Sequence, residues 1–328
     1  GNQLHTLPPE MASCTRLELL RIAANRFTAL PLWLLQLPRL AWLAFAGNPL
    51  TESAEAAAQA QALARIDWAD LHLEHQLGEG ASGVIHQALW QRVTLAQAQA
   101  PEPQPQPQPQ PQPVAVKLFK GALTSDGLPR HEMAACLSAG AHPNLITVHG
   151  EVANHPHGAH GLVMALVDAR FRSLAGPPSL DSCTRDVYAP DTRFTLDAAL
   201  ALAGGIASAA RQLHARGIMH GDLYAHNILH DGHGQALLGD FGAASFFQPG
   251  DAALAPALQR IEVRAFSCLL EELLARCQAP AGAPVAQDAL QALAHLQADC
   301  AQEDASARPL FGDIHTRLKS MQRLLAIA

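Results

Sequence analysis

The chain has 328 residues, of which 49% are hydrophobic and 16% charged, and its formal net charge is −7. This length allows two domains, or one large domain with an appendage, and the apolar content is ample for a core. The acidic balance disfavours nucleic acid as a partner, because binding phosphates requires surplus Lys and Arg. Aromatic residues make up 5% of the chain, too few for a base-stacking surface.

Neither the cysteines nor any apolar run points to an oxidising or membrane environment. The six cysteines are scattered without C-x-x-C or metal-ligand spacing, so we expect reduced thiols that pack as small hydrophobes. The longest run of small and apolar residues, 198–210, is shorter than the ~18 residues of a membrane span and predicts a buried helix. We expect a cytoplasmic protein with no membrane span.

Residues 1–50 repeat with a period of 23, marked by Asn2, Asn25 and Asn48. Twice, apolar residues precede the asparagine in the pattern L-x-x-L-x-[IF]-x-x-N. A period of about 20–29 residues with this pattern resembles leucine-rich repeats, in which each unit adds a short strand and buries its leucines against its neighbours. Two units are fewer than the roughly three that stand alone, so these units need a longer solenoid upstream or the residues that follow.

Two further segments are distinguished by their composition: a connector after the repeats and an insertion in the region that follows. Residues 51–70 have high helix propensity and predict a helical connector. Residues 96–113 end in alternating Pro and Gln, which predicts a solvated polyproline II insertion. This insertion interrupts an expected hairpin between Trp90 and Val114.

From residue 77 onward, short motifs follow one another in a fixed order. Residues 77–85 carry Gly78, Gly80 and Gly83 between apolar residues. This arrangement predicts a strand, a turn and a second strand, in which glycines let main-chain N–H groups cover phosphates.

The next motifs provide an ion pair and a buried strand. The alternating residues 114–119 predict a strand that carries Lys117, and Glu132 lies on the following helical stretch as its expected partner. Residues 161–167 form a continuous apolar strand, suited to a buried position behind a nucleotide base.

The loop HGDLYAHN, residues 220–227, and the later GDFG bring three polar side chains into the series. Asp222 is spaced to act on a substrate hydroxyl. Asn227 and Asp240 supply hard oxygen ligands of the kind that Mg²⁺ prefers. The ordered series from the glycine loop to Asp240 is far more specific than any one of its members.

With these motifs in place, residues 71–325 resemble a protein kinase catalytic domain, and the attached repeats resemble those of bacterial leucine-rich-repeat protein kinases. Residues 261–274 and 300–314 are similar to two later segments of the family. The resemblance implies an α+β, bilobal protein-kinase-like fold preceded by a short leucine-rich-repeat fragment, with a small lobe at 71–167 and a helical lobe at 168–325.

The resemblance also implies ATP and Mg²⁺ as cofactors and a protein hydroxyl as the substrate. Lys117 would bind the α- and β-phosphates while paired with Glu132, Asp222 would accept the hydroxyl proton, and Asn227 with Asp240 would hold Mg²⁺. The residues implied in nucleotide binding are Leu77, Gly78, Gly80, Gly83, Ile85, Ala115, Lys117, Met164 and Val167.

Several positions depart from the family pattern. The catalytic loop usually reads H-R-D-L-K-x-x-N, but Gly221 replaces the arginine that pairs with a phosphorylated activation loop, and Tyr224 replaces the lysine. The A-P-E motif ends in Ala257, so Arg308 lacks the glutamate that it usually pairs with. Glu262 stands where a buried aspartate usually bonds the catalytic-loop backbone.

Three functions remain open at this stage. The first is an active protein kinase, with Ser/Thr favoured over Tyr. The second is a small-molecule phosphotransferase, since H-G-D-x-x-x-x-N is also found in aminoglycoside- and choline-kinase-like enzymes. The third is a pseudokinase scaffold that binds nucleotide, with repeats that bind a protein ligand.

Overall fold

The structure is a computed structural model that describes residues 2–60, 64–80, 82–91, 110–121, 127–182, 184–278 and 283–327. Most of the predicted polyproline II insertion, residues 96–109, lies outside the described residues. Gln112 and Pro113, at its end, already belong to a strand. This strand pairs with the one that ends at Trp90, so the expected hairpin is formed around the insertion.

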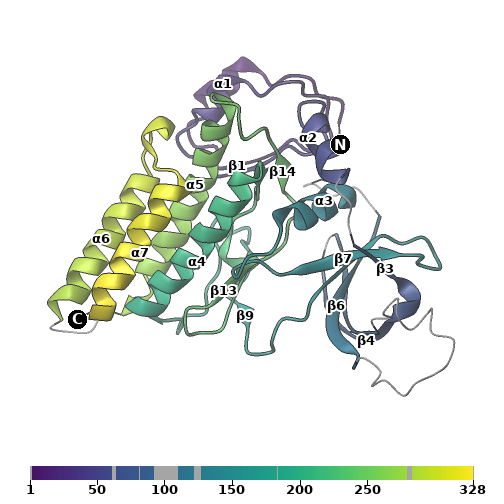
Figure 1. Cartoon of the computed structure of the whole chain (residues 1–328). Helices are drawn as coiled ribbons and strands as arrows, with labels where there is room; N and C mark the ends of the chain where they lie inside the picture. The colour runs from purple at the N-terminus through teal and green to yellow at the C-terminus, as the bar shows by residue number, and fades with distance from the viewer. Residues whose placement is uncertain are drawn as a thin grey trace.

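A six-stranded sheet forms the small lobe, on the right of Figure 1. Its strands, in spatial order, are β3 (Arg65–Asp67), β7 (Val148–Ala153), β8 (Gly161–Ala165), β6 (Gln112–Phe119), β5 (Gly83–Trp90) and β4 (Leu71–Glu79). Helix α3 (Pro129–Ala139) packs beside this sheet and contacts β7. The prediction of a helical connector therefore applies only to its first half, because Arg65–Asp67 form an edge strand of this sheet.

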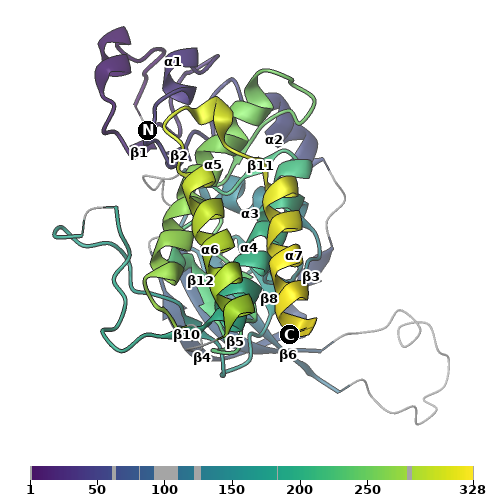
Figure 2. The same cartoon turned by 90° about the vertical axis from the view of Figure 1, so that its left-hand side faces the viewer.

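The large lobe is mainly helical. Figures 1 and 2 show its long helices side by side: α4 (Leu196–Ala215), α5 (Leu254–Leu274), α6 (Pro284–Cys300) and α7 (Phe311–Ile327). The predicted buried helix at 198–210 lies within α4, which starts where the side chain of Thr195 accepts a hydrogen bond from the Ala198 N–H at 3.2 Å. Small residues along α4 let its neighbours approach closely, and α4 contributes much of the main core.

Short strands form three small sheets in the large lobe. One small sheet joins β9 (Arg172–Ser173), β12 (Ile228–His230) and β13 (Ala236–Leu238). The two other pairs are β11 (Ile218–Met219) with β14 (Ser245–Phe246), and β10 (Phe194–Thr195) with β15 (Cys277–Gln278). Single 3₁₀ turns lie at η1 (Pro9–Ser13), η2 (Trp68–Asp70), η3 (Ala225–Asn227) and η4 (Ala305–Ala307).

The N-terminal segment, residues 2–60, contains one strand per sequence unit. Strands β1 (Leu19–Arg21) and β2 (Trp42–Ala44) pair in parallel, and helices α1 (Leu32–Leu35) and α2 (Glu52–Gln59) follow them. The repeated asparagines bond main-chain groups: the side-chain amide of Asn48 donates to the carbonyls of Ile22 at 3.0 Å and Phe45 at 2.8 Å. Asn25 donates to the Ile22 carbonyl at 3.0 Å.

The N-terminal segment lies directly on the rest of the molecule. In Figure 1 it runs along the top, with α1 over one end of α5 and α2 beside α3. Its leucines and phenylalanines share one apolar cluster with residues of α5 and with Met219 and Phe247. The two repeat units therefore bury their apolar face against the large lobe.

In the part of the chain that the structure describes, no helix combines the length and apolar character needed to cross a bilayer. The five cysteines among these residues, Cys14, Cys136, Cys268, Cys277 and Cys300, are free thiols.

Candidate active site

Strand β6 and helix α3 bring Lys117 and Glu132 together. The Lys117 ammonium donates a hydrogen bond to the Glu132 carboxylate, and the two side chains are 12% and 4% exposed. Burial opposes the charge of Lys117, but attraction to Glu132 and Asp240 outweighs it and raises the lysine pKa. Burial raises the pKa of Glu132, opposed by Lys117. The lysine is therefore held as a cation beneath the sheet.

A cavity of about 140 Å³ between the lobes collects most of the predicted polar residues. Predicted residues on its wall are Ile85, Lys117, Glu132, Met164 and Asp240. The remaining lining is mainly apolar and was not predicted: Cys136, Ala139, Leu145, Ile146, Val148, Leu162, Gly239 and Phe241. A dry, apolar wall behind a few polar groups is typical of a small-molecule site.

The glycine-rich loop forms the predicted strand, turn and strand, with β4 and β5 joined across Gly80. The Gly80 N–H donates to the Gly83 carbonyl at 2.9 Å, and Lys120 bridges Glu79 at 2.7 Å to the turn. A side chain at Gly83 would lie 2.5 Å from the Leu118 carbonyl, so glycine is required there.

The other predicted nucleotide-binding residues lie outside that wall. Gly78 is in β4, Leu77 is 46% exposed, Ala115 is buried in β6 opposite Met164, and Val167 is half-buried after β8. None of these four lines the 140 Å³ cavity.

The loop HGDLYAHN places Asp222 beside Asn227. The Asn227 side-chain amide donates to the Asp222 carbonyl at 2.9 Å and to its carboxylate at 3.1 Å. Glu262, from α5, accepts a hydrogen bond from the Gly221 N–H at 2.8 Å. Glu262 is one methylene longer than the family's aspartate, and it makes a hydrogen bond to the loop backbone as that aspartate would.

Main-chain bonds connect this loop to the GDFG segment. The Gly239 N–H donates to the Asn227 carbonyl at 2.9 Å, and the His220 Nε2 donates to the Gly239 carbonyl at 2.9 Å. Asp240 has a left-handed backbone with φ of 52°, and its carboxylate accepts a hydrogen bond from the Gly242 N–H at 3.1 Å. Such a sparsely populated conformation is common where a functional side chain must be aimed.

The oxygen atoms that could act as metal ligands in this region suit a magnesium ion better than a softer metal. Asn227 and Asp240 offer amide and carboxylate oxygens, which hard cations prefer, and Mg²⁺ typically takes only one or two protein ligands together with substrate phosphates. Within the described ranges, no group of three or more His, Cys, Asp or Glu side chains is arranged to hold a metal.

A second pair of titratable side chains, not predicted from the sequence, joins the HGDLYAHN loop to Asp186. The His226 Nδ1 is 2.7 Å from the buried carboxylate of Asp186, which also accepts the His226 main-chain N–H at 3.2 Å. Burial lowers the pKa of His226, but the hydrogen bond and charge of Asp186 outweigh it, and the net shift is upward. The pair brings the 168–193 segment to the loop, and no motif marks Asp186.

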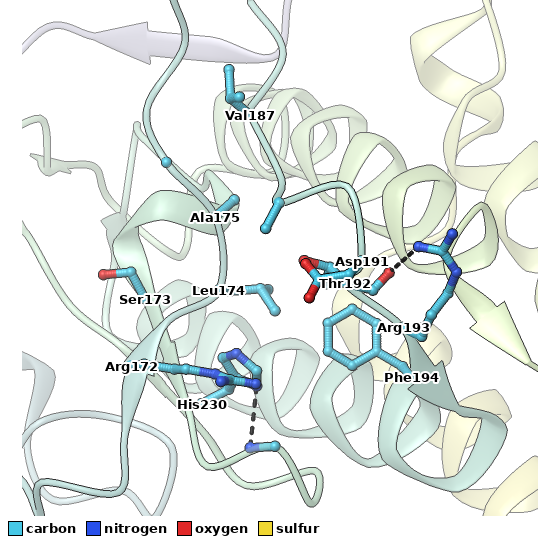
Figure 3. Close-up of a pocket in the computed structure, with 13 residues that line it drawn as sticks. Arg172, Ser173, Leu174, Ala175, Val187, Asp191, Thr192, Arg193, Phe194 and His230 are labelled. Carbon is cyan, nitrogen blue, oxygen red and sulfur yellow. Dashed lines mark hydrogen bonds between the residues drawn. The ribbon is translucent and has the colours of Figure 1, made fainter.

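A larger cavity, of about 550 Å³, lies away from these groups in the large lobe. Figure 3 shows the rings of Phe194 and His230 and the side chain of Arg172 around it. None of the predicted site residues lines it, so cavity size alone does not locate the chemistry.

A comparison with known protein families assigns the chain to a class of protein. Residues 71–267 match the model of the protein tyrosine and serine/threonine kinase family. This match covers more than half of the chain, and the chain belongs to that family.

A curated relative agrees with this assignment. The chain is 26% identical over 171 residues to a protein of Dictyostelium discoideum described as "Probable serine/threonine-protein kinase gdt4". The matched part is 52% of this chain and 8% of the length of that relative.

Proposed function

We propose that the chain is an ATP- and Mg²⁺-dependent protein kinase that transfers the γ-phosphate to a serine or threonine hydroxyl of a protein. The observation that supports this most is the arrangement of five side chains. The paired Lys117 and Glu132 share one cavity with Asp240, and Asn227, which is bonded to Asp222, accepts a main-chain hydrogen bond from Gly239, next to Asp240.

Each of these side chains has a role in the proposed reaction. Lys117, fixed by Glu132, binds the α- and β-phosphates, and Asp222 orients the substrate hydroxyl and takes its proton as the oxygen bonds to the γ-phosphorus. The bond from that phosphorus to the β–γ bridging oxygen breaks, and ADP leaves. Asn227 and Asp240 hold Mg²⁺, which neutralises charge on the phosphates when bound.

Transfer of radiolabelled γ-phosphate to the chain itself and to a basic test protein measures this activity. We expect transfer by the wild-type chain and a loss of about 10²-fold or more in Asp222→Ala and in Lys117→Ala. Phosphoserine or phosphothreonine in the labelled product supports the proposed specificity, which the name of the Dictyostelium relative favours.

One observation favours a second candidate, a pseudokinase that binds nucleotide without transferring phosphate. Tyr224 stands where a lysine is usual, and its ring is buried against Trp42. Nucleotide-induced thermal stabilisation without transfer would support this candidate. Transfer to a small alcohol alone would instead support an aminoglycoside-kinase-like phosphotransferase.

We further propose that the N-terminal segment consists of leucine-rich repeats. One short strand per unit, parallel pairing of β1 with β2, and asparagine side chains that bond the turns all support this proposal. A protein ligand of these repeats, a bacterial source and a cytoplasmic location remain predictions.

A further inference from the structure

The N-terminal segment contacts the catalytic loop, the residues that follow GDFG, and helix α3. We propose that this segment is a positioning element of the active site, which holds the catalytic loop and α3 in their working positions. This inference builds on the proposed kinase activity. It assigns to the segment a task that the family gives to a phosphorylated activation loop, whose arginine partner is absent here.

The first contact is an aromatic stack on the catalytic loop. The rings of Trp42, in β2, and Tyr224 are parallel within 1°, with centroids 4.1 Å apart. The Trp42 Nε1 donates to the Leu223 carbonyl at 3.4 Å, and both rings are buried. Because Leu223 and Tyr224 directly follow Asp222, the stack restricts the backbone that aims the Asp222 carboxylate.

The second contact explains the glycine that replaces the family's arginine. Gly221 has a φ of 78°, and a Cβ atom there would lie 2.5 Å from the Ala243 carbonyl and 3.0 Å from the Leu43 carbonyl. Leu43 belongs to β2. A side chain at Gly221 would therefore collide with the Ala243 carbonyl and press on the Leu43 carbonyl of the N-terminal segment. Nearby, the Phe45 N–H donates to Ser245 Oγ at 3.0 Å.

The third contact reaches the helix that carries Glu132. The neighbouring His131 is 2% exposed, and its Nε2 lies 3.4 Å from the Glu55 carboxylate of α2. The same carboxylate accepts a hydrogen bond from the Gly47 N–H at 2.8 Å. Helix α2 therefore packs against the helix whose position forms the Lys117–Glu132 pair.

Hydrogen bonds from a buried arginine also fix the segment to the large lobe. Arg308, which lacks the family's glutamate partner, donates to the carbonyls of Gln302 at 2.9 Å, Arg260 at 3.1 Å and Pro38 at 2.7 Å. Pro38 belongs to the N-terminal segment. The N-terminal segment thus contacts the loop, α3 and Arg308 at the same time.

Substitutions of Trp42 in the full chain test this inference. We expect Trp42→Ala to lower kcat by about tenfold or more with little change in the KM for ATP, because a misplaced catalytic group slows the chemical step more than it weakens binding. Amide hydrogen exchange of residues 221–227 should become faster by a similar factor. Trp42→Phe retains a stacking ring, so its kcat and its loop exchange rate should stay close to the wild-type values.

Trp33→Ala is the matched control, because Trp33 lies in the same segment and packs in its apolar cluster, away from the loop. We expect Trp33→Ala to leave loop exchange and kcat near the wild-type values. If Trp42→Ala does not fold, Trp42→Leu keeps apolar bulk without the stack and gives the same comparison.

Unchanged loop exchange in the Trp42 variants, or an equal change in Trp33→Ala, would overturn the inference. Absence of phosphate transfer in the wild-type chain would count against the proposed function instead. The exchange comparison needs no activity, so it decides the positioning role in either case.

Discussion

The carboxylate of Glu262 accepts a hydrogen bond from the main-chain N–H of Gly221 at 2.8 Å, although 41 positions separate the two residues. Its second oxygen lies 2.6 Å from the Nε2 of His214. Burial by itself would raise the pKa of Glu262, but the hydrogen bond and charge of His214 outweigh it, and the pKa is lowered. A buried carboxylate thus ties helices α4 and α5 to the catalytic loop.

We expect Glu262→Ala to lower the free energy of unfolding by about 3–5 kcal/mol, because it leaves His214 and the Gly221 N–H buried without their partner. A lowered carboxyl pKa means that this stabilisation is present above pH 4.5 and is lost as the pH falls further. Urea unfolding at pH 7 and pH 4 measures both effects. The exposed Glu303→Ala is the control, and a loss below about 1 kcal/mol at pH 7 would contradict the prediction.

Gly221→Ala tests the close approach of the Ala243 and Leu43 carbonyls to the catalytic loop. Gly232 has a similar φ of 82°, but a Cβ there meets no atom within 4 Å. Both substitutions incur backbone strain of about 1 kcal/mol, whereas only the one at Gly221 adds a collision. We expect Gly221→Ala to lose about 2 kcal/mol more than Gly232→Ala in thermal unfolding. Equal losses would show that the space at Gly221 is open.

Glu272 predicts a pH dependence of stability. Its carboxylate accepts a hydrogen bond from the Tyr188 hydroxyl at 2.9 Å, and burial raises the Glu272 pKa from 4.5 to about 7. The folded state binds the proton of the Glu272 carboxyl more tightly than the unfolded state does. The protonated carboxyl therefore contributes fully to the stability of the fold below pH 4.5, and this contribution is lost as the pH rises to about 7.

We expect Glu272→Gln to be more stable than the wild-type chain at pH 8, by on the order of 2–3 kcal/mol, and to lose the slope between pH 5 and pH 7. Denaturant titrations across this range measure it. Glu271→Gln removes a neighbouring carboxylate that is 59% exposed and serves as the control. Parallel pH profiles of wild type and Glu272→Gln would be evidence against a raised pKa.

Arg308→Lys tests how the N-terminal segment is fixed to the large lobe. A lysine cannot reproduce the planar fork that serves three carbonyls, so we expect a loss of about 2–4 kcal/mol and faster proteolysis within residues 2–60. Burial and the nearby Arg264 lower the pKa of Arg308 to about 10, and the carboxylate of Asp304 offsets this only in part. Proteolysis at the wild-type rate would contradict this prediction.

The polar part of the proposed site could be named from the sequence because short local patterns determine it, and its role stays a prediction. Lys117 was placed by strand alternation, and Asp222 and Asn227 by spacing within a single loop. Asp240 was assigned to the same cleft because the motifs follow one another in the order found in the protein kinase fold. The apolar wall was not predictable, because residues such as Leu145 and Leu162 look like ordinary core.

The sequence indicated that two repeat units need support from an upstream solenoid or from the residues that follow, but not which residues the N-terminal segment would contact. Trp42 and Tyr224 are far apart along the chain, and each is explained locally as a repeat residue or a variant of a loop motif. Only the fold shows that both departures lie against β2: the Tyr224 ring stacks on Trp42, and Gly221 is close to the Leu43 carbonyl as well as to that of Ala243.

The bond from Arg308 to the Pro38 carbonyl joins residues 270 positions apart. During synthesis, the leucines around Pro38 cannot bury their apolar face against the large lobe until the residues of α5 have also left the ribosome. Contacts at such long separation slow folding and expose sticky surface in the meantime. The nascent protein should therefore depend on chaperones, and its yield should fall when they are depleted.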